Sequence, residues 1–208
     1  MPNQGFPSFG SQGEGRGRGL GWGGILGFVK PLALVSAPLA PIALIGGWTL
    51  AAALRPGFDP VGETISELAA VDAPNRWIMT TGLALTGVAH VGTAWSLDEA
   101  APWGRAALAL GGVSAGLVAV FALPSPAHAP VAAASFVLLA VWPAAAVVPS
   151  RRVGWVAAGT LSALLVWFGL ELGGPRVGLS ERVVAGAQSL WPLAAVAVTA
   201  ARARRARS

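Results

Sequence analysis

The chain has 208 residues, of which 54% are hydrophobic and only 11% are charged, and its mean hydropathy is +0.64. A water-soluble domain carries charge on about a quarter of its residues, so this chain cannot cover a water-facing surface and a bilayer is the expected solvent. Cysteine is absent, which excludes disulfides, thiolate metal sites and cysteine nucleophiles.

The first part of the chain divides into a polar tail and an apolar segment. Residues 1–30 are rich in Gly and polar side chains, and we expect them to form a disordered cytoplasmic tail. Residues 31–54 are apolar and follow a basic stretch that resembles the start of a signal peptide (Arg16, Arg18 and Lys30). Because about 24 apolar residues exceed the length of a signal-peptide core, an uncleaved first spanning helix is predicted.

Five more apolar segments follow, each of about the 20 residues that a helix needs to cross a hydrocarbon core. They cover residues 77–97, 104–123, 129–148, 154–172 and 181–201. The sequence therefore predicts an all-α polytopic membrane protein, a bundle of six transmembrane helices within residues 31–201. Residues 202–208 are expected to form a basic cytoplasmic tail.

Small residues recur at about four-residue spacing in the segments "GLALTG", "GGVSAG", "AAGTLSA" and "VAGAQS". Such faces allow helices to approach closely in a bilayer, where the hydrophobic force between helices is weak. We expect these faces to pack within the bundle, while homo-oligomerisation through one of them and a separate protein partner both stay open.

The distribution of positive charge predicts the orientation in the membrane. With both termini in the cytoplasm, ten Lys and Arg side chains lie inside and four lie outside, which follows the positive-inside rule. Thirteen Arg against one Lys, with no Tyr, indicate a GC-rich bacterial coding sequence. We therefore expect a multi-pass protein of the bacterial inner (plasma) membrane. No nucleic-acid partner is expected, because the basic residues form no face interleaved with aromatic side chains.

The connector "FDPVGETISELAAVDAPNRW", residues 58–77, holds four of the nine acidic residues of the chain. In the predicted topology this connector is the first outer loop. Thr64 and Glu67 have the spacing of a capping box, so the simplest interpretation is a short capped helix or turn at the membrane interface.

Polar residues also stand at the outer ends of later helices, where we expect them to meet the first outer loop. The expected ligand-binding cluster contains Glu63, Ser66, Glu67, Arg76, His128, Glu171, Glu181 and Arg182. Three interpretations stay open: a structural ion-pair network, a site for a lipid headgroup, or a catalytic centre. Glu171 ends a helix, where an acid opposes the helix dipole, so it needs a partner such as Arg176 or Arg182.

Roles within this cluster follow from side-chain chemistry. Arg76 and Arg182 are expected to hold a phosphate, with Glu181 and Glu67 orienting them or His128. If the protein is catalytic, His128 is the candidate general base and Ser66 the less favoured nucleophile. The sequence leaves open whether the protein is an enzyme and favours a non-catalytic role.

Two further polar residues fall inside predicted membrane segments. His90 lies about 20 Å along its helix, deep in the hydrocarbon, and Gln188 lies two turns below Glu181 on about the same face. His90 and His128 lie at different depths, which argues against zinc. The chain also has no G-x-S-x-G or G-x-x-x-x-G-K-[ST] motif, and we expect neither a metal nor a cofactor.

The order of these features resembles the DUF998 family of small bacterial integral membrane proteins. The resemblance rests on "DPVGETISELAA", "HAPVAAASFVLL" and "GLSERVVAGAQSLWPL", and it covers residues from about 31 to 200. It implies the six-helix architecture rather than an activity.

A looser similarity links the chain to the FRAG/DRAM/Sfk group, whose members are associated with lipid handling and glycolipid-anchor remodelling. Ile65 and Ser66 match an I-S motif of that group, His128 matches a His that begins a later helix, and Glu181 matches an acid near the last helix. Arg182 departs from the group, in which an aromatic residue is expected.

These observations predict a lipid-associated membrane protein whose outer polar cluster binds a lipid headgroup, with membrane lipids as its partners. The alternative is a non-catalytic structural or accessory subunit, in which the cluster only stabilises the bundle. A small-solute transporter is less favoured, because His90 is the only ionisable residue deep in the predicted membrane.

Overall fold

A computed structural model describes residues 30–205, and these residues are helical with short connections. Six long helices and one short helix follow each other in the chain. They are α1 (Pro31–Ala53), α2 (Ile65–Leu68), α3 (Arg76–Ser96), α4 (Pro102–Val120), α5 (His128–Ala146), α6 (Arg151–Leu170) and α7 (Val177–Arg205). The prediction of an all-α fold is confirmed, and the six long helices follow the six expected segments in order.

The bounds of the last helix differ from the expected ones. α7 begins at Val177, four residues before the expected start, and continues to Arg205, so the helix extends into the basic residues 202–205. The basic side chains in its last turn interact favourably with the helix dipole (Arg202, Arg204 and Arg205). The expected N-terminal tail falls outside the described residues, apart from Lys30.

Five helices, α1, α4, α5, α6 and α7, are long and apolar enough to cross a membrane. α3 has 21 residues, as long as its neighbours, but it carries more polar side chains, among them Thr86, His90 and Thr93. Since these three side chains are buried, α3 turns its polar side toward the protein and packs between α1 and α4. It therefore completes the expected set of six.

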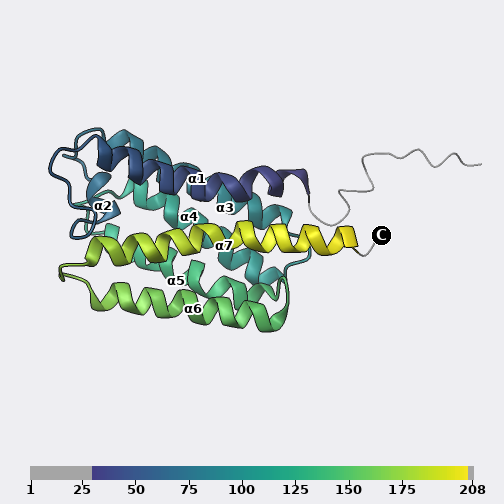
Figure 1. The fold of residues 1–208 in the computed structure, drawn as a ribbon. Coiled ribbons are helices and arrows are strands. Elements are labelled where there is room, and N and C mark those ends of the chain that lie inside the picture. Colours follow the sequence, from purple (N-terminus) through teal and green to yellow (C-terminus); the bar gives the residue numbers. More distant parts are fainter. Residues whose placement is uncertain (1–29, 206–208) are drawn as a thin grey trace, which may run out of the picture.

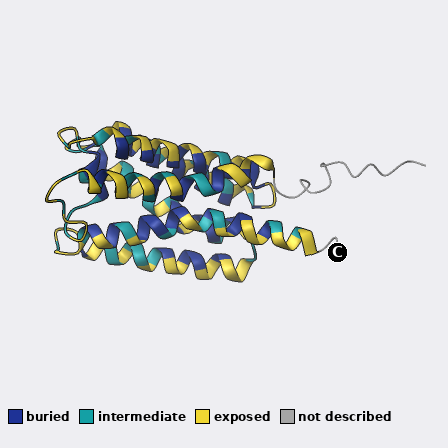
Figure 2. Cartoon of the chain, turned by 45° about the horizontal axis from the view of Figure 1, so that its top comes forward, coloured by how far each residue is buried: buried dark blue, intermediate teal, exposed yellow. Residues whose placement is uncertain are grey.

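The outer surface of the bundle is apolar. Figure 2 shows exposed positions along the outer sides of the helices, and large hydrophobic residues occupy many of them, including Val35, Ile42 and Val120. Exposed Trp side chains lie near both ends of the bundle, as at the interfaces of membrane proteins (Trp77, Trp95, Trp103 and Trp155). A surface of this kind suits lipid rather than water, so the chain is a membrane protein.

The six long helices form a closed ring in which each packs on the next. The order is α1, α3, α4, α5, α6 and α7, and α7 closes the ring against α1. Figure 1 shows α2 and its loops at one end of the bundle, called the α2 end, while α1 begins and α7 ends at the other, called the terminal end. α7 also touches α3 and α5 across the ring, so it lies partly inside the bundle.

Small residues allow the tightest of these contacts, as the sequence predicted. A Cβ atom on Gly87 of α3 would lie 2.6 Å from the carbonyl oxygen of Gly112 in α4. Two of the expected faces, "GLALTG" and "GGVSAG", therefore meet each other within one chain. A Cβ atom on Gly159 in "AAGTLSA" would meet nothing within 4 Å, so this exposed glycine faces away from the bundle.

The hydrophobic core has two parts, one toward each end of the bundle. The part at the terminal end contains Leu97, Leu108 and Trp142, and the part at the α2 end contains Ile65, Leu68 and Met79. The candidate site lies at the α2 end, beneath the loop that carries α2.

Candidate functional site

The short helix α2 is held by a capping box, which confirms the interpretation of Thr64 and Glu67. The backbone N–H of Glu67 donates to Thr64 Oγ1 at 3.2 Å, and the backbone N–H of Thr64 donates to Glu67 Oε2 at 2.5 Å. Ile65 and Leu68 are buried and attach α2 to the core below it. These contacts fix Ser66, which lies between them.

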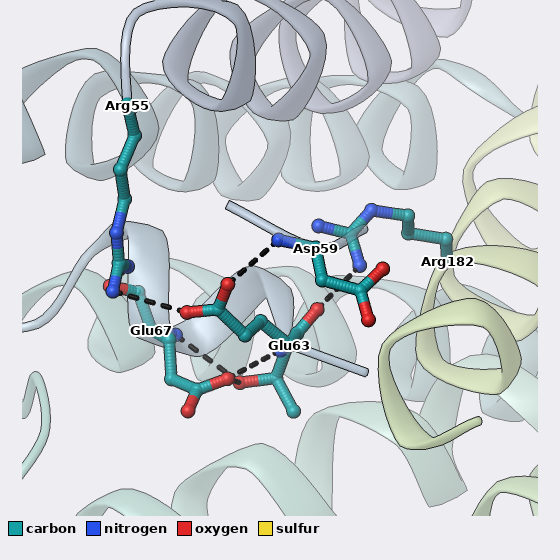
Figure 3. Close-up of polar contacts among 6 residues, drawn as sticks. Arg55, Asp59, Glu63, Glu67 and Arg182 are labelled. Carbon is teal, nitrogen blue, oxygen red and sulfur yellow. Dashed lines mark hydrogen bonds and ion pairs between the residues drawn. The ribbon is translucent and has the colours of Figure 1, made fainter. Parts of the chain in front are cut away.

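Two arginines fasten the preceding loop to the bundle (Figure 3). Arg55 reaches Glu63 from one side, with an Nη2 to Oε1 distance of 3.1 Å, and Arg182 reaches the loop from the other. Arg182 Nη1 donates to three carbonyl oxygens, those of Pro60 at 2.8 Å, Glu63 at 2.7 Å and Gly178 at 2.9 Å. Both guanidinium groups also lie over the ring of Phe58, so the loop is held by Arg55 at its own start, just past α1, and by Arg182 from α7.

The loop lies directly on the backbone of α7. A Cβ atom on Gly178 would lie only 2.1 Å from the carbonyl oxygen of Glu63. The backbone N–H of Leu179 donates to the carbonyl oxygen of Val61 at 3.0 Å. Glycine at position 178 is therefore what lets the acidic loop reach the start of the last helix.

This arrangement brings three distant polar side chains together: Ser66, His128 and Glu181. Ser66 Oγ lies 3.0 Å from His128 Nε2 and 3.3 Å from Glu181 Oε1. Glu181 Oε2 also accepts a hydrogen bond of 2.5 Å from the backbone N–H of Ile65. The three side chains come from α2, α5 and α7 and are named the Ser66 cluster below.

Hydrogen-bond chemistry fixes the tautomer of His128. Its Nδ1 lies 2.9 Å from the carbonyl oxygen of Phe121, and a carbonyl only accepts, so Nδ1 carries a proton. In a neutral His128, Nε2 then accepts a hydrogen bond from the hydroxyl of Ser66. The hydroxyl has no second proton to donate, so its bond to Glu181 requires a protonated carboxyl that donates to Ser66 Oγ. In a charged His128, Nε2 donates to Ser66, which donates to the carboxylate. The two forms hold the same number of protons, so Ser66 can pass one between His128 and Glu181.

Glu181 is buried, with 4% of its surface exposed, and it makes no salt bridge with any described residue. The neighbouring Arg182 directs Nη1 to carbonyls instead, while its Nη2 is buried without a hydrogen-bond partner in residues 30–205. The carboxyl group bonds only neutral groups, the backbone N–H of Ile65 and the hydroxyl of Ser66. Such a group is a candidate binding or proton-exchanging group rather than half of an ion pair.

The Ser66 cluster borders a cavity inside the helix ring, with a volume of about 60 Å³. Its walls are largely apolar side chains of α1, α3, α4, α5 and α7, such as Leu44, Val118 and Phe136. Five polar side chains line it below Ser66 and Glu181: Thr86, His90, Ser135, Gln188 and Ser189. Its lining is apolar with a few placed polar groups, as in small-molecule sites, but its volume is well below the roughly 300–1,000 Å³ of such sites.

The other expected site residues lie around the cluster without joining it. Glu171 pairs with Arg176 at 2.7 Å, which confirms that it needed an arginine partner, and it also accepts from Trp167. The carboxylate of Glu67 is used in the capping box, and that of Glu63 pairs with Arg55. Arg76 is half-buried, and its side chain makes no hydrogen bond or ion pair to the acids of the described residues. The phosphate-holding role of Arg76 and Arg182 stays a prediction.

Sequence reasoning missed several parts of the site. In the sequence, Arg55 counted only as one of the four positive charges expected outside. The backbone groups of Ile65 and Phe121 also bond the site, and no side chain in the sequence indicates such bonds. Thr86, Ser135 and Ser189 looked like ordinary small residues of membrane helices, since hydroxyl groups are common there. Only the three-dimensional arrangement shows that they line one cavity with His90 and Gln188.

The fold and the site define a polytopic α-helical membrane protein with a polar cluster beneath a fastened loop. The family described as "protein of unknown function (DUF998)" matches residues 38–198, so the chain belongs to this family. The match includes all three residues of the Ser66 cluster. No curated protein and no solved structure matches the chain, so the looser resemblance to the FRAG/DRAM/Sfk group gains no support.

Proposed function

We propose that this protein is a lipid-associated membrane protein that binds the polar headgroup of a lipid at the Ser66 cluster. The observation that carries the proposal is the meeting of Ser66, His128 and Glu181, from three separate helices, at the border of an interior cavity. Buried polar groups are costly within a membrane and are usually functional.

The chemistry of the cluster suits an exchangeable ligand. The bond from Ser66 to Glu181 is long, at 3.3 Å, so a ligand hydroxyl or phosphate can replace it at little cost. Arg182 Nη2, which is buried without a protein partner in the described chain, is the remaining donor for an anionic group.

The α2 end would face the outside of a bacterial plasma membrane, with the termini in the cytoplasm. Within the described residues, seven Lys and Arg side chains belong to the terminal end and four to the α2 end. The positive-inside rule supports this orientation. The site would then bind lipids of the outer leaflet.

The test is mass spectrometry of lipids that co-purify with the protein, comparing the wild type with Ser66→Ala. The matched control is Ser36→Ala, because Ser36 is a buried serine that bonds Thr93 at 2.9 Å away from the cavity walls. We expect one lipid class to be enriched in the wild type and the control and lost in Ser66→Ala. If no lipid class is enriched in the wild type, the cluster is a structural element of an accessory subunit and the proposal is wrong.

A further inference from the structure

His90 is the most unusual buried group in the described chain. It lies in the middle part of α3 with no exposed surface, and neither ring nitrogen has a hydrogen-bond partner among the described residues. An imidazole has one donor and one acceptor even when it is neutral, and leaving both unsatisfied in an apolar interior is unfavourable. His90 therefore requires a partner that the protein itself does not supply.

The cavity beneath the Ser66 cluster gives access to such a partner, because His90 forms part of its wall. The other polar side chains of its lower part already bond the protein. Thr86 donates to Gly82, Ser135 to Gly111, Ser189 to Gly186, and Gln188 to Phe136. Their oxygen atoms still have free lone pairs, so they can accept hydrogen bonds from a small molecule in the cavity.

These polar groups descend through the bundle in steps. Counted along each helix from the α2 end, Glu181 lies ~6 Å deep, Ser135 ~11 Å, Gln188 ~17 Å and His90 ~21 Å. Successive levels are thus separated by roughly one or two water diameters. A cavity of about 60 Å³ has room for on the order of four waters.

We propose that the cavity binds a short chain of water molecules that connects His90 with Glu181 and the Ser66 cluster. The chain gives His90 proton exchange with the α2 end of the bundle. Glu181 and His90 are the titratable groups on the cavity wall, and His128 joins them at the border through Ser66. The walls from α1, α4 and α5 present apolar and hydroxyl side chains only.

The path ends at His90 and does not cross the membrane. Below it, toward the terminal end, the ring is filled by the core of Leu97, Leu108 and Trp142, all at most 2% exposed. The buried hydroxyl groups of Ser36 and Thr93 bond each other there and are not part of the cavity wall. The proposed water chain therefore stops at His90 and is closed toward the terminal end, and this inference is independent of lipid binding at the cluster.

Solid-state NMR of the protein in bilayers tests the proposal directly. The chain has two histidines, so 15N-histidine labelling gives two imidazoles, and His128→Gln leaves His90 alone. Magnetisation is transferred from water to the ring nitrogens, with His128 in the wild type as the reference at the border of the cavity. We expect transfer to His90 at a rate within about threefold of that to His128.

A variant that fills the cavity provides a second test of the proposal. Ala115 lies on the wall, and Ala115→Leu should abolish transfer from water to His90 while leaving transfer to His128 unchanged. Absence of transfer to His90 in the wild type would show a dry cavity and overturn the proposal. Transfer from lipid protons instead of water would also overturn it, because the cavity would then hold a lipid. Equal transfer to His90 in Ala115→Leu would show that water reaches it by another route, which contradicts the assignment to this cavity.

Discussion

Ser66 Oγ lies 3.0 Å from Nε2 of His128, although 62 positions separate the two residues in the chain. The contact exists because the capping box fixes α2 and the loop before it is fastened to α7. The carbonyl of Phe121 then turns the unprotonated nitrogen of a neutral His128 toward the hydroxyl.

Glu181 should matter to stability through its hydrogen bonds rather than through a salt bridge. Glu181→Ala leaves the N–H of Ile65 and one bond of Ser66 without a partner, which costs about 1–3 kcal/mol. This is less than the roughly 3–5 kcal/mol expected when one member of a buried ion pair is removed. Glu181→Gln keeps an acceptor and should stay close to the wild type. Thermal unfolding in detergent measures both, and equal losses in the two variants would show that the charge itself is required.

Arg182 and Arg55 should differ in how strongly they hold the acidic loop. Arg182→Ala removes a group that bonds three carbonyls, so we expect hydrogen exchange in residues 54–64 to increase at least tenfold. The pair of Arg55 and Glu63 is only partly buried and is worth about 0–1 kcal/mol, and Arg55 bonds one carbonyl oxygen, that of Glu67 at 3.2 Å, so Arg55→Ala should have a smaller effect. A larger effect of Arg55→Ala would mean that contacts within the loop, rather than the contact with α7, hold it in place.

How far the sequence predicts this molecule depends on whether a feature is local. Helix order depends on hydropathy and the capping box on the three-residue spacing from Thr64 to Glu67, and both are confirmed. Glu171 was predicted to need Arg176 or Arg182, and the nearer of the two, five positions along the chain, forms the pair. The roles of Arg55 and the backbone carbonyls were missed, because they depend on the path of the loop.

The same limit explains the interior of the bundle. His90 and Gln188 were identified as intramembrane polar residues, but no pattern in the sequence shows that a cavity joins them to the loop. A cavity is the space that side chains from five long helices leave unfilled. Its existence depends on small differences in packing, which no single segment encodes.

Gly178 provides a test of the contact between the loop and α7. Gly178→Ala places a methyl group 2.1 Å from the carbonyl oxygen of Glu63. The methyl group is fixed to the backbone of α7 and the oxygen belongs to the backbone of the loop, so no side chain can turn aside and the loop must move away. The matched control is Gly169→Ala in α6, where nothing lies within 4 Å and alanine should stabilise the helix by about 0.5–1 kcal/mol. We expect a lower melting temperature for the first variant and an equal or higher one for the second. If both variants melt at the wild-type temperature or above, the loop is not packed on α7 in solution.

The absence of cysteine allows a clean test of orientation. Asp72→Cys lies in the exposed loop at the α2 end, and Glu99→Cys lies in the exposed loop between α3 and α4 at the terminal end. A maleimide that cannot cross membranes should label the first variant in intact cells and the second only after the cells are broken. The reverse pattern would place the α2 end in the cytoplasm and contradict binding of outer-leaflet lipids.

The tautomer of His128 makes Ser66 a candidate nucleophile as well as a binding group. Nε2 can take the hydroxyl proton as Ser66 Oγ attacks the phosphorus of a fluorophosphonate probe and fluoride leaves. If the cluster is catalytic, the probe should label Ser66 in bilayers, labelling should fall at least tenfold in His128→Gln, and Ser36→Ala should label like the wild type. Peptide mass spectrometry locates the adduct. A hydroxyl beside an unprotonated imidazole should react with the probe if it is accessible. If Ser66 carries no adduct at probe concentrations that label a serine hydrolase control, the cluster is restricted to binding.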